Sequence, residues 1–252
     1  MVHGPSSMVD RLLSMVRGPS SMVHRPWSVV CGPSSVVQHP PAVINRSDIH
    51  YLRSKRVSGV LLAAGRSSRM GRPKQLLPWH GVPLVRHAAQ TALSSQLSEV
   101  IIVVGFESSS VRAAVADLPV RIVQNDRYEE GQAASIHAGI AALAPESQAA
   151  MIMLVDQPLL QATTIDLLIA AWQLPWLIVA PQHAGRRGHP VLFARPLFDA
   201  LRAIEGDLGA RNVIKRHADA LRVVEVADAG VVIDMDTPEM YRCLSERSGD
   251  EL

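Results

Sequence analysis

From residue 57 onward, short apolar runs alternate with amphipathic segments, and this alternation limits the fold more than any other feature of the sequence. The runs are rich in β-branched residues, as in parallel strands that are covered on both faces. Strands are expected at residues 57–63, 99–104, 120–124, 150–155 and 177–180. Helices are expected between them at residues 84–94, 109–116, 133–144 and 163–172. This order predicts an α/β fold with a Rossmann-like, doubly wound and mostly parallel sheet.

The pattern changes after residue 180, where a loop rich in Gly, Arg and His begins. Further strands are expected at residues 191–194, 222–226 and 231–233, and helices at residues 196–203 and 210–217. A last helix is expected after Thr237, an N-cap residue, and Pro238, which suits the first helical position. We therefore place one domain at residues 57–244 and expect residues 245–252 to be a flexible tail.

The first fifty residues repeat with a period of seven, and the element GPSS returns at Gly4, Gly18 and Gly32. A seven-residue period is typical of coiled coils, but the frequent prolines would break every helical turn. We expect residues 1–50 to lack a fixed fold, because they cannot bury enough apolar area to offset their ordering entropy. A translated repeat upstream of the true start and a binding tail both stay open.

Composition excludes several functional classes. The formal net charge is +2, which gives no electrostatic basis for bulk nucleic-acid binding. The two cysteines, Cys31 and Cys243, fit neither a disulfide framework nor a metal-binding spacing, and this favours a reducing cytoplasm. No apolar stretch reaches the roughly 18 residues that a membrane span requires. We therefore expect a cytoplasmic protein that binds neither nucleic acid nor membrane.

The first predicted strand runs into a basic loop, in the segment VLLAAGRSSRMGRPKQLLP. Ligands of doubly wound sheets bind beyond the carboxyl ends of the strands, and backbone N–H groups after Gly65 suit phosphate oxygens. The segment is neither a P-loop nor a GxGxxG dinucleotide motif. Arg69 has the forked geometry for phosphate oxygens, and Lys74 offers a mobile point charge. The alternative is a solvated basic loop.

Acidic residues follow two other predicted strands. Asp156 comes directly after an apolar run, so its carboxylate is expected at the same rim of the sheet, where it suits Mg²⁺. An N-cap or turn role is the alternative. Asp234 and Asp236 alternate with apolar residues in VVIDMDTPEMY, on a segment that is expected to be extended.

The pattern L-A-A-G-x-x-x-R-M-G-x-x-K resembles the signature of the molybdenum-cofactor nucleotidyltransferases, the MobA-like NTP transferase family. The resemblance covers about residues 58–241. Guanylyl-transferring members typically have two glycines where this chain has Ala64-Gly65, the form associated with the cytidylyl branch. The resemblance implies a GT-A-like nucleotidyltransferase fold, with Arg69, Lys74 and Asp156 as catalytic residues and with Asp156 and Asp236 as metal ligands.

The resemblance also implies two binding regions. The implied nucleotide-binding residues are Leu62, Ala63, Ala64, Gly65, Lys74, Gly131, Gln132 and Ser135. The implied residues for the second substrate lie in HAGRRGHPVLF and GDLGARNVI, namely Arg186, Arg187, His189 and Arg211. Arginines there suit a terminal phosphate, and His189 suits contact with a pterin or a metal dithiolene.

The implied reaction is transfer of CMP from CTP to molybdenum-molybdopterin, which gives molybdopterin cytosine dinucleotide and pyrophosphate. The implied cofactor is Mg²⁺, with Mn²⁺ as an alternative, and an implied partner is a recipient molybdoenzyme or its chaperone. Because the nucleophile is already an anionic phosphate, catalysis needs positioning and charge neutralisation rather than a strong base. A guanylyltransferase, a sugar-phosphate nucleotidyltransferase and a non-catalytic molybdenum cofactor carrier or chaperone stay open as alternatives.

Overall fold

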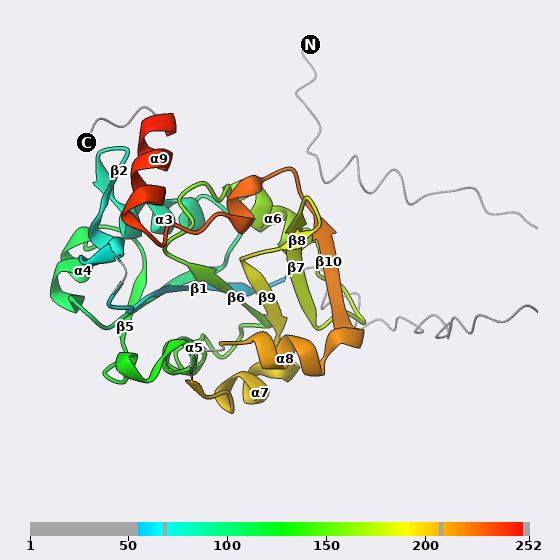
Figure 1. Ribbon diagram of the computed structural model, residues 1–252. Helices are drawn as coiled ribbons and strands as arrows, with labels where there is room; N and C mark the ends of the chain where they lie inside the picture. The colour runs from blue at the N-terminus through cyan, green and yellow to red at the C-terminus, as the bar shows by residue number, and fades with distance from the viewer. Residues whose placement is uncertain (1–54, 68–69, 207–208, 249–252) are drawn as a thin grey trace, which may run out of the picture. The chain divides into compact units, whose positions relative to one another are not determined.

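The computed structural model describes residues 55–67, 70–206 and 209–248, in which strands and helices alternate (Figure 1). The main sheet has eight strands in the order β10-β7-β9-β6-β1-β4-β5, and β8 pairs with β7. These strands are β1 (Val57–Ala63), β4 (Glu99–Val104), β5 (Arg121–Gln124), β6 (Ala149–Leu154), β7 (Ile178–His183), β8 (Arg186–Arg187), β9 (Val191–Ala194) and β10 (Leu221–Glu225). A separate hairpin joins β2 (Pro78–Trp79) to β3 (Val82–Pro83).

The central pairs of the sheet are parallel: β1 lies between β4 and β6, and β5 continues from β4. The strand β9 is antiparallel to both of its neighbours, β6 and β7, and β10 pairs parallel to β7. The mostly parallel α/β sheet predicted from the sequence is therefore confirmed. Because β1 and β6 are parallel neighbours, their carboxyl ends lie side by side at one rim.

Helices cover both faces of the sheet (Figure 1). One face packs against α3 (Leu84–Leu93), α4 (Ser108–Ala114), α6 (Ala162–Ala171) and α9 (Pro238–Ser248). The other packs against α5 (Gln132–Ala141), α7 (Phe198–Arg202) and α8 (Arg211–Arg216). Short 3-10 helices are η2 (Lys74–Leu76), η3 (Tyr128–Glu130), η4 (Arg195–Leu197), η6 (Ala218–Ala220) and η7 (Ala229–Val232).

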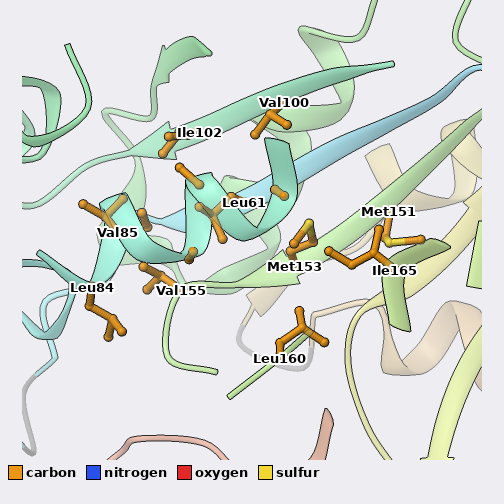
Figure 2. Packing of buried hydrophobic residues seen from close by; sticks show 14 of the residues in the cluster. Leu61, Leu84, Val85, Val100, Ile102, Met151, Met153, Val155, Leu160 and Ile165 are labelled. Carbon is orange, nitrogen blue, oxygen red and sulfur yellow. The ribbon is translucent and has the colours of Figure 1, made fainter. Parts of the chain in front are cut away.

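The continuous apolar character of β1 follows from this double cover. Leu61 and Ala63 belong to the hydrophobic cluster on the α3 face, whereas Val60 and Leu62 belong to the cluster on the α5 face. Successive side chains of a strand point to opposite faces, so a strand buried on both faces needs apolar residues at every position. Figure 2 shows the first cluster, in which Leu61 lies among side chains from β4, β6 and α3.

Two expectations about the C-terminal part are wrong. Residues 231–233 do not form a strand, because the chain turns into η7, where the Asp228 side chain accepts a hydrogen bond from Gly230 N. The flexible tail does not begin at residue 245, because α9 continues to Ser248 and Ser245 is buried. The start of α9 is as expected, since Met240 N donates to Thr237 Oγ1 at 3.3 Å.

The seven-residue repeats at residues 1–50 lie outside the described residues. Across residues 55–67, 70–206 and 209–248, none of the helices combines the length and apolar character needed to cross a membrane.

We expect Asp228→Asn to destabilise the fold by about 1–3 kcal/mol. The buried Asp228 carboxylate accepts from Gln161 N at 3.0 Å, Thr164 Oγ1 at 2.7 Å and Gly230 N at 2.8 Å, which ties α6 to η7. An amide turns one of these acceptor positions into a donor that faces another donor. Thermal melts measure the loss, with the exposed Asp219→Asn as the control; equal melting temperatures for both variants would contradict the role of Asp228.

Candidate active site

The loop after β1 is held by a buried amide that the sequence analysis missed. Gln75 is 1% exposed, and its Nε2 donates to Gly65 O at 3.2 Å and to Phe106 O at 3.4 Å. Ser67 Oγ accepts a hydrogen bond from Lys74 N at 3.0 Å. These bonds fold the basic loop back on itself and fix the start of η2, so Lys74 is placed at the carboxyl end of β1.

Lys74 joins the two acidic segments. Its Nζ donates to Asp156 Oδ2 and, at 3.0 Å, to Asp236 Oδ1, although the two acids lie 82 and 162 residues away in the chain. Asp156 reaches this point because it follows β6, the parallel neighbour of β1. Asp236 arrives from the segment between η7 and α9. The ammonium and the two carboxylates therefore share one site.

The charges in this cluster are strongly coupled. Burial alone would lower the pKa of Lys74, but the carboxylates of Asp156 and Asp236 outweigh this effect and raise the pKa above its usual value. Lys74 is therefore fully charged near neutral pH. Asp156 is 9% exposed, and its Oδ1 is buried without a hydrogen-bond partner among the described residues. A buried, unpartnered carboxylate oxygen is costly unless a ligand or an ion satisfies it.

A cavity of about 400 Å³ opens beside this cluster. Its lining includes Lys74 and Asp156, the Ala64-Gly65 turn, and Ser135 from the first turns of α5. The helix can lie directly on β1 because Gly139 has no side chain: a Cβ there would be 2.3 Å from Val60 Cγ1. This close packing brings the start of α5 to the rim at which Lys74 lies.

Aromatic and charged side chains that the sequence analysis did not predict as site residues lie at the outer wall of the first cavity. Arg66 pairs with Glu129, and its guanidinium lies 5.6 Å from the ring centre of Tyr128 and 5.8 Å from that of Phe106. Arg66, Tyr128 and Glu129 all line the cavity. A planar cation stacked near aromatic rings offers a ligand both a flat surface and positive charge.

A second cavity of about 560 Å³ is lined by cationic side chains. It contains Arg186 and Arg187 of β8, Arg211 and Lys215 of α8, and His189. The two β8 arginines are exposed and lie on a hairpin with β7. Positive charge gathered on two separate segments, β8 and α8, suits an anionic ligand.

The two cavities are neighbours. A smaller hollow of about 130 Å³ shares Gln132 and Leu154 with the first cavity and His189, Arg211 and Asp234 with the second. A ligand in the cationic cavity therefore has a short route to the site of Lys74.

A buried amide at the floor of the second cavity was not predicted as a site residue. Gln157 is 4% exposed, and its Nε2 donates to Val231 O at 3.1 Å and to Asp234 Oδ1 at 2.9 Å. Burial, together with the negative charge of Asp156, raises the pKa of Asp234. Burial lowers the pKa of His189, although Asp234 and Asp156 oppose the shift. No motif distinguishes Gln157 in the sequence, because its proximity to Val231 and Asp234 arises only from the fold.

The structure brings most of the predicted site residues together. Leu62, Ala64, Gly65, Lys74, Gly131, Gln132, Ser135 and Asp156 line the first cavity, and Arg186, Arg187, His189 and Arg211 line the second. Ala63 does not line either cavity, because its side chain points into the α3-side core. Arg69 lies outside the described residues. Asp234 faces the second cavity, whereas Asp236 contacts Lys74.

Comparison of the sequence with known proteins identifies relatives of this chain. The family model described as the MobA-like NTP transferase domain matches residues 59–221. The chain is 37% identical to nicotine blue oxidoreductase of Paenarthrobacter nicotinovorans, across 75% of this chain and 96% of that protein. It is 29% identical to molybdenum cofactor cytidylyltransferase of Escherichia coli, across 75% of this chain and 95% of that protein.

A solved structure with the same fold is a complex with manganese. The complex of Rv0371c from Mycobacterium tuberculosis H37Rv with manganese superposes with a TM-score of 0.65 and is 30% identical, covering 76% of this chain and 98% of that one.

Proposed function

Because the chain belongs to the MobA-like NTP transferase family, we propose that it transfers CMP from CTP to the terminal phosphate of molybdenum-molybdopterin. The products are molybdopterin cytosine dinucleotide and pyrophosphate. The observation that carries the proposal is the contact of Lys74 with both Asp156 and Asp236 beside a cavity of nucleotide size. The relative named molybdenum cofactor cytidylyltransferase supports this choice of nucleotide and acceptor, as does the Ala64-Gly65 form of this chain.

The carboxylates fit a divalent metal. Asp156 and Asp236 offer hard oxygen ligands, and the unpartnered Oδ1 of Asp156 is one such ligand. Among the described residues no three His, Cys, Asp or Glu side chains converge on one point, so two carboxylates are the protein's contribution. That number suits Mg²⁺, which usually takes its other ligands from phosphates and water, with Mn²⁺ as the alternative. When bound, the ion would neutralise phosphate charge.

The protein's own residues bind, orient and neutralise the substrates. Lys74, placed by the Gln75-held loop, stabilises the negative charge that develops on the triphosphate, and Arg69 has the same task in our proposal. The backbone of Ala64-Gly65 and the start of α5 hold the nucleoside in the first cavity. The attacking phosphate is already an anion, so no general base is required. In-line attack then depends on how closely the two cavities hold the reactants.

The cationic second cavity receives the acceptor in this proposal. Arg186, Arg187 and Arg211 bind the terminal phosphate, while His189 contacts the pterin or its metal dithiolene. The short hollow between the cavities supports direct attack on a nucleotide in the first cavity. A carrier of finished cofactor would have no use for a lysine and two acids arranged for triphosphate chemistry.

The test incubates purified protein with each of the four nucleoside triphosphates, Mg²⁺ and molybdenum-loaded molybdopterin, and measures pyrophosphate and the mass of the product. We expect pyrophosphate release with CTP and a cytosine dinucleotide product. Preference for GTP would identify a guanylyltransferase. Cofactor binding without pyrophosphate would identify a carrier. Oxidation or reduction of nicotine blue, without any pyrophosphate, would instead favour the activity named for the 37% identical relative.

A further inference from the structure

A chain of hydrogen bonds with a fixed direction ends in the first cavity. It begins at a backbone amide: Arg127 N donates to Asn125 Oδ1 at 3.0 Å. A backbone amide can only donate, so the oxygen of the Asn125 side chain must face Arg127. The nitrogen of the same amide group therefore faces Ser135 and donates to its Oγ at 3.0 Å. Asn125 is 5% exposed and Ser135 is 6% exposed, so water does not replace these bonds.

This series of hydrogen bonds determines which further bonds the Ser135 hydroxyl can form. A hydroxyl has one hydrogen and two acceptor lone pairs, and one lone pair is taken by Asn125 Nδ2. Serine in a helix often donates its hydrogen to the carbonyl four residues earlier, which here is that of Gly131. No such bond is present between these two described residues, and the hydroxyl donates to no other described residue. Ser135 lines the first cavity, so its hydrogen is available to a ligand there.

From this polarity we propose that Asn125 is a specificity-determining residue that holds Ser135 as a hydrogen-bond donor to the nucleotide base. The inference rests on the proposed function, in which the first cavity binds a nucleoside triphosphate. The site then selects a base that places a carbonyl oxygen or an unprotonated ring nitrogen at Ser135, and it disfavours a base that places an N–H there. Cytosine offers two such acceptors, O2 and N3. Asn125 touches no substrate atom itself, so its role is to position Ser135.

The substitution Asn125→Asp reverses the polarity with almost no change of shape. The new carboxylate still accepts from Arg127 N, but its second oxygen also accepts, so the Ser135 hydroxyl must donate back to residue 125. The only hydrogen of the hydroxyl is then lost to the base. We expect calorimetric titration to give Mg-CTP dissociation constants about fivefold to tenfold weaker for Asn125→Asp and for Ser135→Ala. The double variant is expected to be no weaker than Ser135→Ala alone, because both changes remove the same bond.

The dissociation constants of two CTP analogues, compared with that of CTP, give a measurement that would not change if Asn125 and Ser135 only stabilised the fold. The 3-deaza analogue lacks the N3 acceptor, and the 2-thio analogue weakens the acceptor at O2. We expect the unmodified protein to bind one of them about fivefold or more weakly than CTP, and both variants to bind that analogue and CTP equally. The control is Asn212→Asp, which makes the same chemical change on the exposed surface of α8 and should keep the preference for CTP.

The outcomes separate this inference from the proposed function. If the protein binds and turns over CTP but does not distinguish the analogues, the role of Ser135 as donor is wrong while cytidylyl transfer stands. If Asn125→Asp weakens CTP further in the Ser135→Ala background, Asn125 acts through something other than Ser135. If no nucleoside triphosphate binds, the proposed function itself fails and this inference fails with it. Should Asn125→Asp not fold, the analogue comparison between the unmodified protein and Ser135→Ala still decides whether the hydroxyl donates.

Discussion

Lys74→Ala is expected to lower the turnover of pyrophosphate release by about two to three orders of magnitude, while the dissociation constant of CTP changes by less than about fivefold. The reason is the position of the ammonium, which lies between Asp156 and Asp236 at the edge of the first cavity. Charge on the triphosphate grows as pyrophosphate leaves, so a fixed cation there stabilises the transition state more than the ground state. The base and ribose keep their own contacts when Lys74 is removed.

The measurement compares single-turnover pyrophosphate release with a calorimetric titration of CTP, so that chemistry and binding are separated. Lys55→Ala is a matched control, because Lys55 is also partly buried but bonds the carbonyls of Ile169 and Ala170 at the end of α6. That variant should lose stability and keep its turnover per folded molecule. Equal losses of turnover and CTP affinity in Lys74→Ala would mean that Lys74 only binds the triphosphate.

The sequence predicted strands and site residues where a local residue pattern and the geometry of a parallel sheet lead to the same position. Apolar runs located β1, β4 and β6, because strands buried on both faces leave no room for polar residues. Asp156 was expected near Lys74 since ligands collect beyond the carboxyl ends of parallel strands. The contact between the two, across 82 residues, confirms this placement. The position of Asp236 came from the resemblance to a family, since its spacing alone did not separate it from Asp234.

The remaining features depend on tertiary contacts that no local pattern records. Val231 and its β-branched neighbours favoured a strand, but the carboxylate of Asp228 captures Gly230 N and turns the chain into η7. The antiparallel insertion of β9 between β6 and β7 follows from the chain path, not from the composition of the strand. Gln75 and Gln157 shape the two cavities as buried amides, and nothing in the sequence distinguishes them from surface glutamines.

Asp156→Asn is expected to reduce Mg²⁺-dependent transfer by at least about a hundredfold at saturating CTP. One carboxylate oxygen of Asp156 contacts Lys74, and the other is buried without a partner among the described residues, which leaves it for the metal. An amide keeps the shape of the side chain but removes the negative charge that attracts a hard divalent cation. Asp236→Asn should have a smaller effect, because Asp236 is the more exposed partner of Lys74, at 35% against 12% for Asp156.

Pyrophosphate release across a series of Mg²⁺ concentrations, together with direct titration of Mn²⁺ by electron paramagnetic resonance, measures the effect of Asp156→Asn. The matched control is Asp228→Asn, which neutralises another buried carboxylate and should lower stability without changing the metal dependence of the folded fraction. If Asp156→Asn keeps normal activity at low Mg²⁺, the metal is held elsewhere and Asp156 serves only to position Lys74. If both variants lose metal dependence alike, the loss reflects a disturbed fold rather than a missing ligand, since Asp228 bonds to the start of α6 and to η7.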